Sequence, residues 1–393
     1  MTETRKRFGT RAVLGGRLPL PEQRPASVPL YQTSTWGFET SEEFADVIAF
    51  RRPGYIYSRG YGNPTVHAFQ SLMADLEGTE SAYAFASGMA AIHGVVTSLA
   101  QAGDWIVASR ELYGGTYSLF RSILPRYGID VEFVNPHDVE AVAAALPGAR
   151  LFYVETLANP VVTVADLEAL GSACRDAGVP GVVDNTFASP YLCTPVELGF
   201  DYVIHSTTKY VGGHSDLIGG VACTTEDRME RLRSLVIDTG GGMQPLEAWL
   251  CMRGLITLPL RMEQHCRTAQ ALAESLESDE RVERVHYPGL PSHPQHDIAT
   301  RELRGFGGML AVEVKGGVEA GRRVSDALEL AWVGGSLGGQ ITLVAHPAST
   351  THRQLDPEAR RAAGIADGLL RVSVGLEDPE DLIEDFAQAL KKA

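Results

Sequence analysis

The chain has 393 residues, of which 44% are hydrophobic, and carries a formal net charge of −15 at pH 7. This length predicts two or three domains of the usual size, and the composition is typical of a globular protein with a hydrophobic core. The acidic balance, without a basic block, argues against nucleic acid or an anionic membrane surface as a partner.

Residues 1–60 show little hydrophobic periodicity and contain five prolines. We expect them to form an arm that packs on another surface, such as a neighbouring subunit. The charged start of this segment is not followed by an apolar run, so we expect no secretory signal. The five cysteines include no Cys-x-x-Cys pair, and their odd number argues against a disulfide framework. We therefore expect a cytoplasmic protein with reduced thiols.

Between residues 61 and 250, short apolar runs alternate with helix-length segments. This alternation predicts an α/β domain with a mostly parallel, seven-stranded sheet and helices on both faces. The stretch Ala82–Ala100 is long enough to span a membrane, but Ser87, Gly88 and His93 interrupt it, so a buried strand and a helix are expected instead. The expected strands are Ala82–Phe85, Trp105–Ala108, Val131–Phe133, Leu151–Val154, Val182–Val183, Tyr202–Ile204 and Val221–Cys223.

Residues 251–393 are expected to form a smaller α+β domain. A long helical segment, from Pro245 to about Ser278, bridges into it, and a helix from Pro379 to Lys392 closes it. Its expected strands lie near Arg284–Tyr287, Met309–Val314 and Leu370–Val374.

Lys209 lies where the apolar run Tyr202–Ile204 passes into hydroxyl residues and then two glycines. A lysine held away from bulk water has a destabilised ammonium, so its pKa falls and its amine becomes a nucleophile toward a carbonyl. Taken alone, such a lysine more often extends its ammonium to solvent or pairs with a carboxylate. Other strand ends decide between these interpretations, because ligands of such sheets bind at the carboxyl ends of the strands.

Three of these strand ends carry residues that could bind parts of a ligand. Ser87 is a good N-cap for a helix whose free amides suit a phosphate, although a plain capped helix has the same pattern. Tyr113, followed by two glycines, suits stacking on a planar group, or ordinary packing. Asp184 ends an apolar strand, where a carboxylate needs a cation or hydrogen-bond donors. Together with the Lys209 amine, these groups are what pyridoxal phosphate requires, and the hydroxyls of Ser206 and Thr208 add phosphate donors.

Eight ordered motifs, from about residue 30 to the C-terminus, resemble the Cys/Met-metabolism family of pyridoxal-phosphate enzymes. They are Tyr57-Ser58-Arg59 with Asn63-Pro64-Thr65, Ser87-Gly88-Met89-Ala90-Ala91, Asp184-Asn185-Thr186-Phe187, His205-Ser206-Thr207-Thr208-Lys209-Tyr210 with Gly213-His214-Ser215-Asp216, Tyr287-Pro288-Gly289-Leu290, Ser336-Leu337-Gly338-Gly339, His346-Pro347-Ala348-Ser349 and Arg371-Val372-Ser373-Val374-Gly375.

The resemblance implies a fold-type-I enzyme in which Lys209 attaches the cofactor, Asp184 pairs with its pyridine nitrogen and Tyr113 stacks on its ring. It also implies an active unit of at least a dimer, commonly within a homotetramer, because the arm reaches the cofactor phosphate of a neighbouring subunit. The implied phosphate ligands are Gly88, Met89, Ser206 and Thr208 with Tyr57 and Arg59 of the arm, and the implied ligands of the substrate carboxylate are Arg371, Asn159 and Ser336.

The resemblance implies a small sulfur amino acid as substrate and leaves several reactions open. Gly335 stands where cystathionine-handling members often carry a glutamate, and Gly115 stands where methionine γ-lyases typically carry a cysteine. We give the glycine at position 335 more weight than the glycine at position 115. We therefore expect a carbon–sulfur lyase that catalyses γ-elimination on methionine or a similar amino acid, giving a 2-oxo acid, ammonia and a thiol. The alternatives are cystathionine γ-lyase and the γ-replacing cystathionine γ-synthase or O-acylhomoserine sulfhydrylase.

Other classes fit less well. The chain has no Gly-x-Gly-x-x-Gly for a dinucleotide and no Gly-x4-Gly-Lys-[Ser/Thr] for a nucleotide phosphate. His286, His293 and His296 are close in sequence but surround prolines, so we expect no metal site. A non-catalytic relative would have lost Lys209 or Asp184, and both are present.

Overall fold

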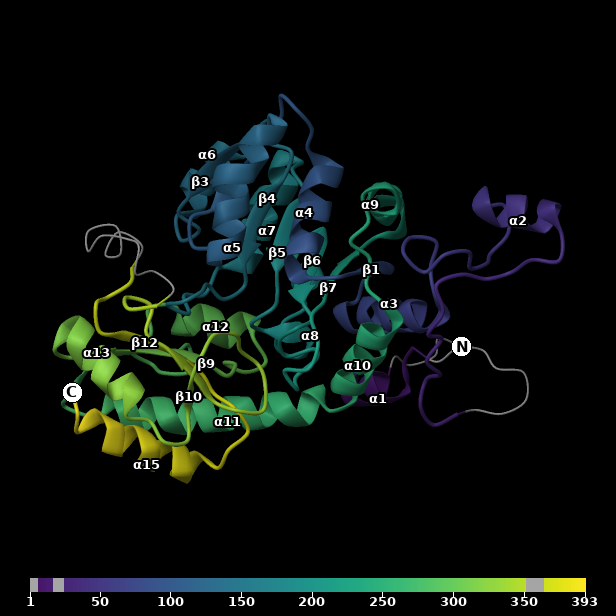
Figure 1. Ribbon diagram of the computed structural model, residues 1–393. Helices are drawn as coiled ribbons and strands as arrows, with labels where there is room; N and C mark the ends of the chain where they lie inside the picture. Colours follow the sequence, from purple (N-terminus) through teal and green to yellow (C-terminus); the bar gives the residue numbers. More distant parts are fainter. Residues whose placement is uncertain (1–5, 17–24, 351–363) are drawn as a thin grey trace.

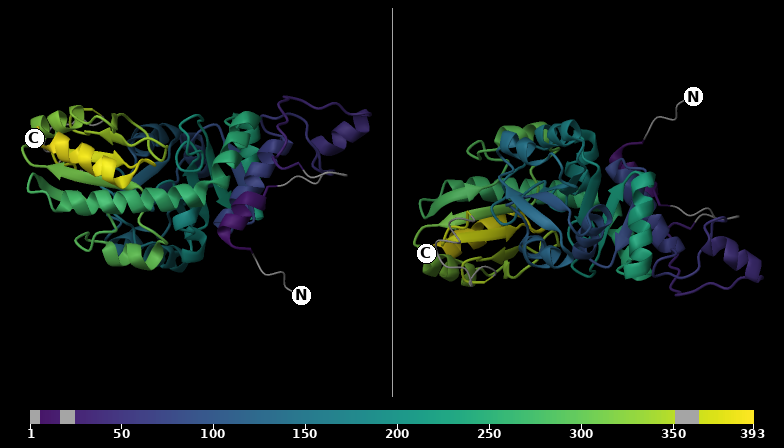
Figure 2. Two further views of the ribbon diagram at one scale, coloured as in Figure 1. Left: turned by 90° about the horizontal axis from the view of Figure 1, so that it is seen from below. Right: turned by 90° about the horizontal axis from the view of Figure 1, so that it is seen from above.

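The computed structural model describes residues 6–16, 25–350 and 364–393. In the arm it contains two helices that the sequence analysis did not expect, α1 (Phe8–Leu14) and α2 (Ser41–Ile48). The α2 helix is capped by Thr40, whose side chain accepts a hydrogen bond from the backbone N–H of Glu43. The segment that carries α2 projects away from the body of the molecule (Figures 1 and 2).

A seven-stranded sheet forms the larger half of the molecule, as predicted, with strand order β1-β7-β6-β5-β4-β2-β3. The β7 strand runs antiparallel to both β1 and β6, and all other neighbours are parallel. The mostly parallel sheet is therefore confirmed, and each predicted strand is present. The strands are β1 (Ser81–Phe85), β2 (Trp105–Ser109), β3 (Asp130–Val134), β4 (Phe152–Glu155), β5 (Gly181–Asp184), β6 (Tyr202–Ser206) and β7 (Gly220–Thr224).

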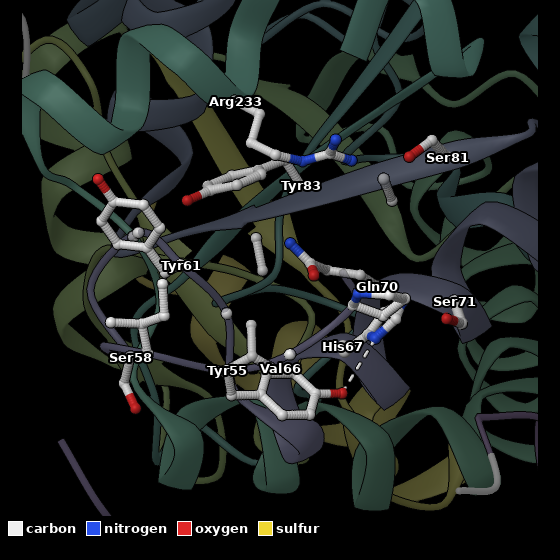
Figure 3. Close-up of a pocket in the computed structure, with 18 of the residues that line it drawn as sticks. Tyr55, Ser58, Tyr61, Val66, His67, Gln70, Ser71, Ser81, Tyr83 and Arg233 are labelled. Carbon is white, nitrogen blue, oxygen red and sulfur yellow. Dashed lines mark hydrogen bonds between the residues drawn. The ribbon is translucent and has the colours of Figure 1, made fainter. Parts of the chain in front are cut away.

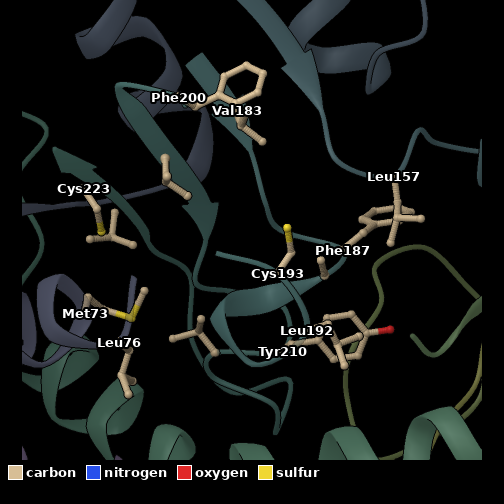
Figure 4. Close-up of a cluster of buried hydrophobic side chains, with 14 of the residues drawn as sticks. Met73, Leu76, Leu157, Val183, Phe187, Leu192, Cys193, Phe200, Tyr210 and Cys223 are labelled. Carbon is tan, nitrogen blue, oxygen red and sulfur yellow. The ribbon is translucent and has the colours of Figure 1, made fainter. Parts of the chain in front are cut away.

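Helices cover both faces of this sheet (Figure 1). Alternate strand residues pack into two separate buried clusters, since successive side chains of a strand point to opposite faces: Val183 and Val203 belong to one, Val182 and Ile204 to the other. Figure 4 shows part of the first cluster. The helices are α3 (Pro64–Glu77), α4 (Gly88–Leu99), α5 (Gly114–Ser118), α6 (Val139–Ala145), α7 (Leu167–Ala177), α8 (Ser189–Leu192) and α9 (Glu226–Thr239), with π-helical Leu119–Ile123 and 3-10 turns Leu124–Tyr127 and Pro195–Leu198.

A second, five-stranded sheet follows, with order β10-β11-β12-β9-β8. The predicted strands correspond to β8 (Val282–His286), β9 (Met309–Val314) and β12 (Leu369–Ser373). The strands β10 (Trp332–Val333) and β11 (Leu343–Ala345) were not predicted, because two or three residues are too few to show a strand pattern. The accompanying helices are α12 (His296–Glu302), α13 (Gly317–Asp326) and α15 (Pro379–Leu390).

The long helical segment expected from Pro245 to about Ser278 consists of two helices, α10 (Pro245–Ile256) and α11 (Leu258–Glu277). Between them Thr257 leaves the helical conformation, with φ −103° and ψ 2°. Pro259 at the start of α11 lacks a backbone N–H and its ring cannot be accommodated within a continuous helix, so one helix ends and another begins here. The α11 helix then runs along the second sheet (Figure 1).

Candidate active site

Lys209 lies in the turn that follows β6, and its side chain reaches the second half of the molecule. Its Nζ donates a hydrogen bond to Ser336 Oγ at 2.7 Å. Burial, and then the positive charge of Arg371, lower the pKa of the Lys209 amine to about 8. At a pKa of about 8, roughly a tenth of this amine is unprotonated at pH 7, far more than at the usual lysine pKa of 10.5, and the unprotonated form is what a nucleophile or a proton acceptor requires.

The loop that contains Ser336 is fitted closely against the backbone around Lys209. Gly338 has φ +72°, and a Cβ at this position would lie 2.7 Å from the backbone nitrogen of Tyr210. Only glycine permits that approach in that conformation. Ser336 also has a positive φ, 82°, which is costly for a residue with a side chain. The strained backbone holds the Ser336 hydroxyl at the lysine amine.

Arg371 on β12 lies beside the same loop. Its Nη2 donates to the carbonyl oxygen of Ser336 at 2.8 Å, and its Nη1 donates to Asn159 Oδ1 at 3.4 Å. Its Nε is buried and has no hydrogen-bond partner among the described residues. Within the described part of the chain, the guanidinium keeps its Nε–H and one N–H of each terminal nitrogen unpaired, so it has donors left for the oxygens of a carboxylate. The structure thus brings together Lys209, Ser336, Arg371 and Asn159, which the sequence analysis had grouped.

Asp184 ends β5, one strand away from the strand that leads to Lys209. Its Oδ1 accepts from the backbone N–H of Thr186 at 3.0 Å, and its Oδ2 accepts from the Tyr153 hydroxyl at 3.3 Å. Burial raises the pKa of this carboxyl group, while the Thr186 hydrogen bonds lower it. A partly buried carboxylate with so few donors suits a cationic partner such as a protonated ring nitrogen.

The N-terminus of α4 lies against the end of β6. Ser87 caps the helix by accepting from the backbone N–H of Ala90 at 3.1 Å. A Cβ on Gly88 would lie 2.8 Å from Ser206 Cβ, so the glycine allows the first turn of the helix, which includes Met89, to approach the strand. Thr208 Oγ1 accepts from the backbone N–H of Gly219 at 3.0 Å in the turn after the strand. Helix amides and hydroxyls therefore meet here, as a phosphate site requires.

Tyr113 immediately precedes α5, and half of its surface is exposed. Its backbone N–H donates to Glu155 Oε1 at 2.6 Å. A Cβ on Gly115 would lie 2.5 Å from Cε1 of the tyrosine ring, so any side chain at position 115 would displace the ring from this position. The ring is available for stacking, and its placement depends on the glycine.

Tyr57 and Arg59 are not brought to Lys209 of the same chain. Arg59 Nη1 donates to the carbonyl oxygen of Ile237 at the end of α9, and the Tyr57 side chain is 45% exposed. Arg59 lines a cavity of about 760 Å³ between the arm and β1, where Tyr61, Tyr83 and Arg233 also lie (Figure 3). Both residues are thus in the arm, and among the hydrogen bonds of the described residues neither bonds to Lys209, Asp184 or Arg371 of the same chain.

Sequence reasoning missed Glu155 and Tyr153, which contact Tyr113 and Asp184 from the neighbouring strand β4. Glu155 directly follows the apolar run Leu151–Val154, so its place at a strand end was a signal that could have found it. Tyr153 lies within that run and looked like a core residue.

The three histidines considered for zinc have other contacts. His286 Nε2 pairs with Glu313 Oε1 at 2.6 Å, and His296 Nδ1 donates to the carbonyl oxygen of Pro288. His293 is buried. Within residues 6–16, 25–350 and 364–393, no group of three or more His, Cys, Asp or Glu side chains is arranged to hold a metal ion, and no helix is long and apolar enough to cross a membrane.

The observed groups fit pyridoxal phosphate, because a partly buried amine, a partly buried carboxylate and a helix N-terminus with adjacent hydroxyls lie at or just after neighbouring strand ends. A family model described as Cys/Met metabolism PLP-dependent enzyme matches residues 9–391. An L-methionine gamma-lyase from Porphyromonas gingivalis is 44% identical, covering 98% of this chain and 97% of the relative. An O-succinylhomoserine sulfhydrylase from Pseudomonas aeruginosa is 43% identical, covering 98% of this chain and 95% of the relative.

The fold also has a solved counterpart, the crystal structure of metB from Corynebacterium glutamicum. That structure superposes with a TM-score of 0.92 at 38% identity, covering 98% of each chain. The sequence match, the fold and the fitted site agree, and the chain belongs to the Cys/Met metabolism family of pyridoxal-phosphate-dependent enzymes.

Proposed function

We propose that this enzyme catalyses γ-elimination on methionine or a similar sulfur amino acid, releasing a 2-oxo acid, ammonia and a thiol. The observation that carries this proposal is the open, uncharged position at Gly335. A Cβ there would have no atom within 4 Å, and the neighbouring Ser336 contacts the Lys209 amine. Gly335 offers no carboxylate to the distal ammonium of cystathionine but leaves room for an uncharged thioether. The 44% identical L-methionine gamma-lyase supports the same reaction.

The cofactor supplies, when bound, an electron-withdrawing ring that stabilises negative charge at the substrate Cα. We assign its attachment to Lys209, its pyridine nitrogen to Asp184 and one ring face to Tyr113. We assign its phosphate to Gly88, Met89, Ser206 and Thr208, and to Tyr57 and Arg59 of a neighbouring subunit.

The remaining groups orient the substrate and move protons. We assign the α-carboxylate to Arg371, whose Nε–H and remaining terminal N–H groups are left for its oxygens, with Asn159 and Ser336 beside it. The amine of Lys209, with a pKa of about 8, is suited to take the proton from Cα and to return protons to neighbouring carbons. The Tyr113 hydroxyl is assigned to donate a proton to the departing sulfur.

The assembly we propose is a homotetramer made of two active dimers. Support comes from the projecting arm, whose exposed Tyr57, Phe44 and Phe50 are available to another subunit (Figures 1 and 2). We further propose an arm over residues 1–60, a cofactor domain over 61–250 and a smaller domain over 251–393. Five unpaired cysteines support a cytoplasmic location.

The test of the function is a comparison of 2-oxo acid release from methionine and cystathionine. We expect the wild-type enzyme to prefer methionine, and Lys209→Ala to release none from either. Gly335→Glu should lower the KM for cystathionine about fivefold, the effect of one partly exposed ion pair, while the uncharged control Gly335→Gln should not. Preferred cleavage of cystathionine by the wild-type enzyme would refute the proposal.

A second candidate is γ-replacement by a sulfhydrylase. It is favoured by Gly115, which stands where methionine γ-lyases typically have a cysteine, and by the 43% identical O-succinylhomoserine sulfhydrylase. Product that forms from O-succinylhomoserine only when sulfide is supplied would favour this reaction over the first.

A further inference from the structure

Glu155 is a buried acidic residue for which the proposed reaction has no use. It ends β4 directly beside Asp184 of β5, because the two residues are partners in the parallel register of these strands. Glu155 is only 6% exposed, and its Oε1 accepts a hydrogen bond from the backbone N–H of Tyr113 at 2.6 Å. One carboxyl group thus lies between the residue assigned to the pyridine nitrogen and the residue assigned to the ring face.

A buried carboxyl group and a partly buried one at adjacent strand ends are unfavourable if both are ionised. Burial, and then the negative charge of Asp184, raise the pKa of Glu155 well above its usual range, although the backbone N–H groups of Tyr113 and Asn159 lower it. Asp184 has donors of its own in Thr186 and Tyr153. We therefore place a proton on Glu155 and the negative charge on Asp184.

The backbone at Tyr113 needs an external anchor. Tyr113 caps the five-residue helix α5 without a side-chain cap bond, and Gly114 and Gly115 follow it. Glycine restrains the backbone least, so the chain itself does not fix the direction in which the tyrosine side chain leaves it. The Glu155 carboxyl, held by the rigid end of β4, supplies a fixed acceptor for the Tyr113 N–H.

We propose that Glu155 is a positioning residue that fixes the backbone of Tyr113 and, by staying neutral, leaves the negative charge of the pair on Asp184. The inference rests on the proposed roles of Tyr113 and Asp184. It predicts that the position of the tyrosine ring over the cofactor depends on an acceptor at residue 155 and not on a charge there.

The test compares Glu155→Gln with Glu155→Ala in the holoenzyme and in the apoprotein. Glutamine keeps an amide oxygen for the Tyr113 N–H and is always neutral, so cofactor affinity, the visible circular dichroism of the bound cofactor and kcat should stay within about threefold of wild type. Alanine removes the acceptor, so the Kd for pyridoxal phosphate should rise about tenfold and the dichroism should weaken.

A double substitution separates positioning from general destabilisation. In a Tyr113→Ala background, Glu155→Ala should change the cofactor Kd less than threefold, because the ring that Glu155 positions is absent. If alanine does not fold, Glu155→Asp replaces it, since the shorter side chain does not reach the Tyr113 N–H and should weaken the dichroism in the same way.

Two results would overturn the inference: a glutamine variant as impaired as the alanine variant, or an alanine effect that is unchanged in the Tyr113→Ala background. These readouts do not depend on the substrate. A wild-type enzyme that fails to cleave methionine would therefore refute the proposed reaction while leaving the role of Glu155 to be decided by cofactor binding.

Discussion

At the scale of single residues, the surroundings of Lys209 lower the pKa of its amine. Lys209 has no carboxylate in contact with its amine among the interactions of the described residues; its Nζ meets the neutral hydroxyl of Ser336 and the field of Arg371. Burial and a like charge both disfavour the ammonium form, which is why its pKa is about 8 and not 10.5. We propose that the same arginine binds the substrate carboxylate, in which case one cation would both bind the substrate and lower the pKa of Lys209.

Replacing Arg371 by glutamine tests both roles. Because a positive charge is removed, the pKa of the Lys209 amine should rise above 8 but stay below 10.5, since burial is the larger cause. The measurement is the pH dependence of Lys209 modification by an amine-selective reagent in the apoprotein, followed by mass spectrometry. The KM for the amino acid should rise about 10- to 100-fold through the lost hydrogen bonds to the carboxylate.

Arg304→Gln is the matched control for this experiment. Arg304 donates to the carbonyl oxygens of Tyr191 and Pro190, and its charge is not among the causes that lower the pKa of Lys209. A pKa near 8 in both variants would show that the Arg371 charge does not act on the lysine.

At the scale of elements, a buried polar network ties four segments together beneath the site. His205 Nε2 on β6 lies 2.5 Å from Glu77 Oε1 on α3, and both side chains are fully buried. Asn185 Nδ2 donates to the same oxygen at 3.1 Å, and Asn185 Oδ1 accepts from the Thr156 hydroxyl at 2.8 Å. The network therefore fixes the chain directly after Asp184 and directly before Ser206.

Breaking this network should destabilise the protein more than an apolar truncation of the same size. Removing the imidazole in His205→Phe leaves a buried glutamate without its nearest partner, and we expect a loss of about 3–5 kcal/mol in the free energy of unfolding. Adding Glu77→Gln should recover part of it, because the unpaired charge is then removed. The measurement is urea unfolding at a fixed subunit concentration. Additive losses in the double variant would contradict the network.

This network also marks how far the sequence could predict the site. The strand ends at Asp184 and Lys209 were predictable because an apolar run passes abruptly into polar residues. Glu77 was not, because it lies in a helix and meets His205 only through the fold. The break between α10 and α11 was overlooked although Pro259 signals it. The short strands β10 and β11 follow from pairing with β12, which no local pattern records.

At the scale of the whole molecule, two histidines that are not among the candidate site residues are buried. They are His265, on α11, and His293, in the loop between β8 and α12. His265 on α11 is fully buried, and its Nδ1 donates to the carbonyl oxygens of Val374 and Gly375 at 2.8 and 3.0 Å. Burial, and then the charge of Arg261, lower its pKa to about 4. Burial, and then the charge of His286, likewise lower the pKa of His293 to about 4. Both therefore connect the stability of the fold to pH.

The direction of this pH dependence follows from the number of protons that the folded and the unfolded chain bind. Between pH 6.5 and 4 the unfolded chain binds a proton at each histidine while the folded chain does not, so the stability present above pH 6.5 is lost as the pH falls toward 4. A pKa of 4 in place of 6.5 corresponds to about 3 kcal/mol for each group. Urea unfolding of the holoenzyme across this range should show this contribution, and His265→Gln, which keeps a donor for the Val374 carbonyl and cannot titrate, should change the slope by the contribution of one proton. An equal slope in the variant would show that His265 is protonated in the folded state and that its burial does not link stability to pH.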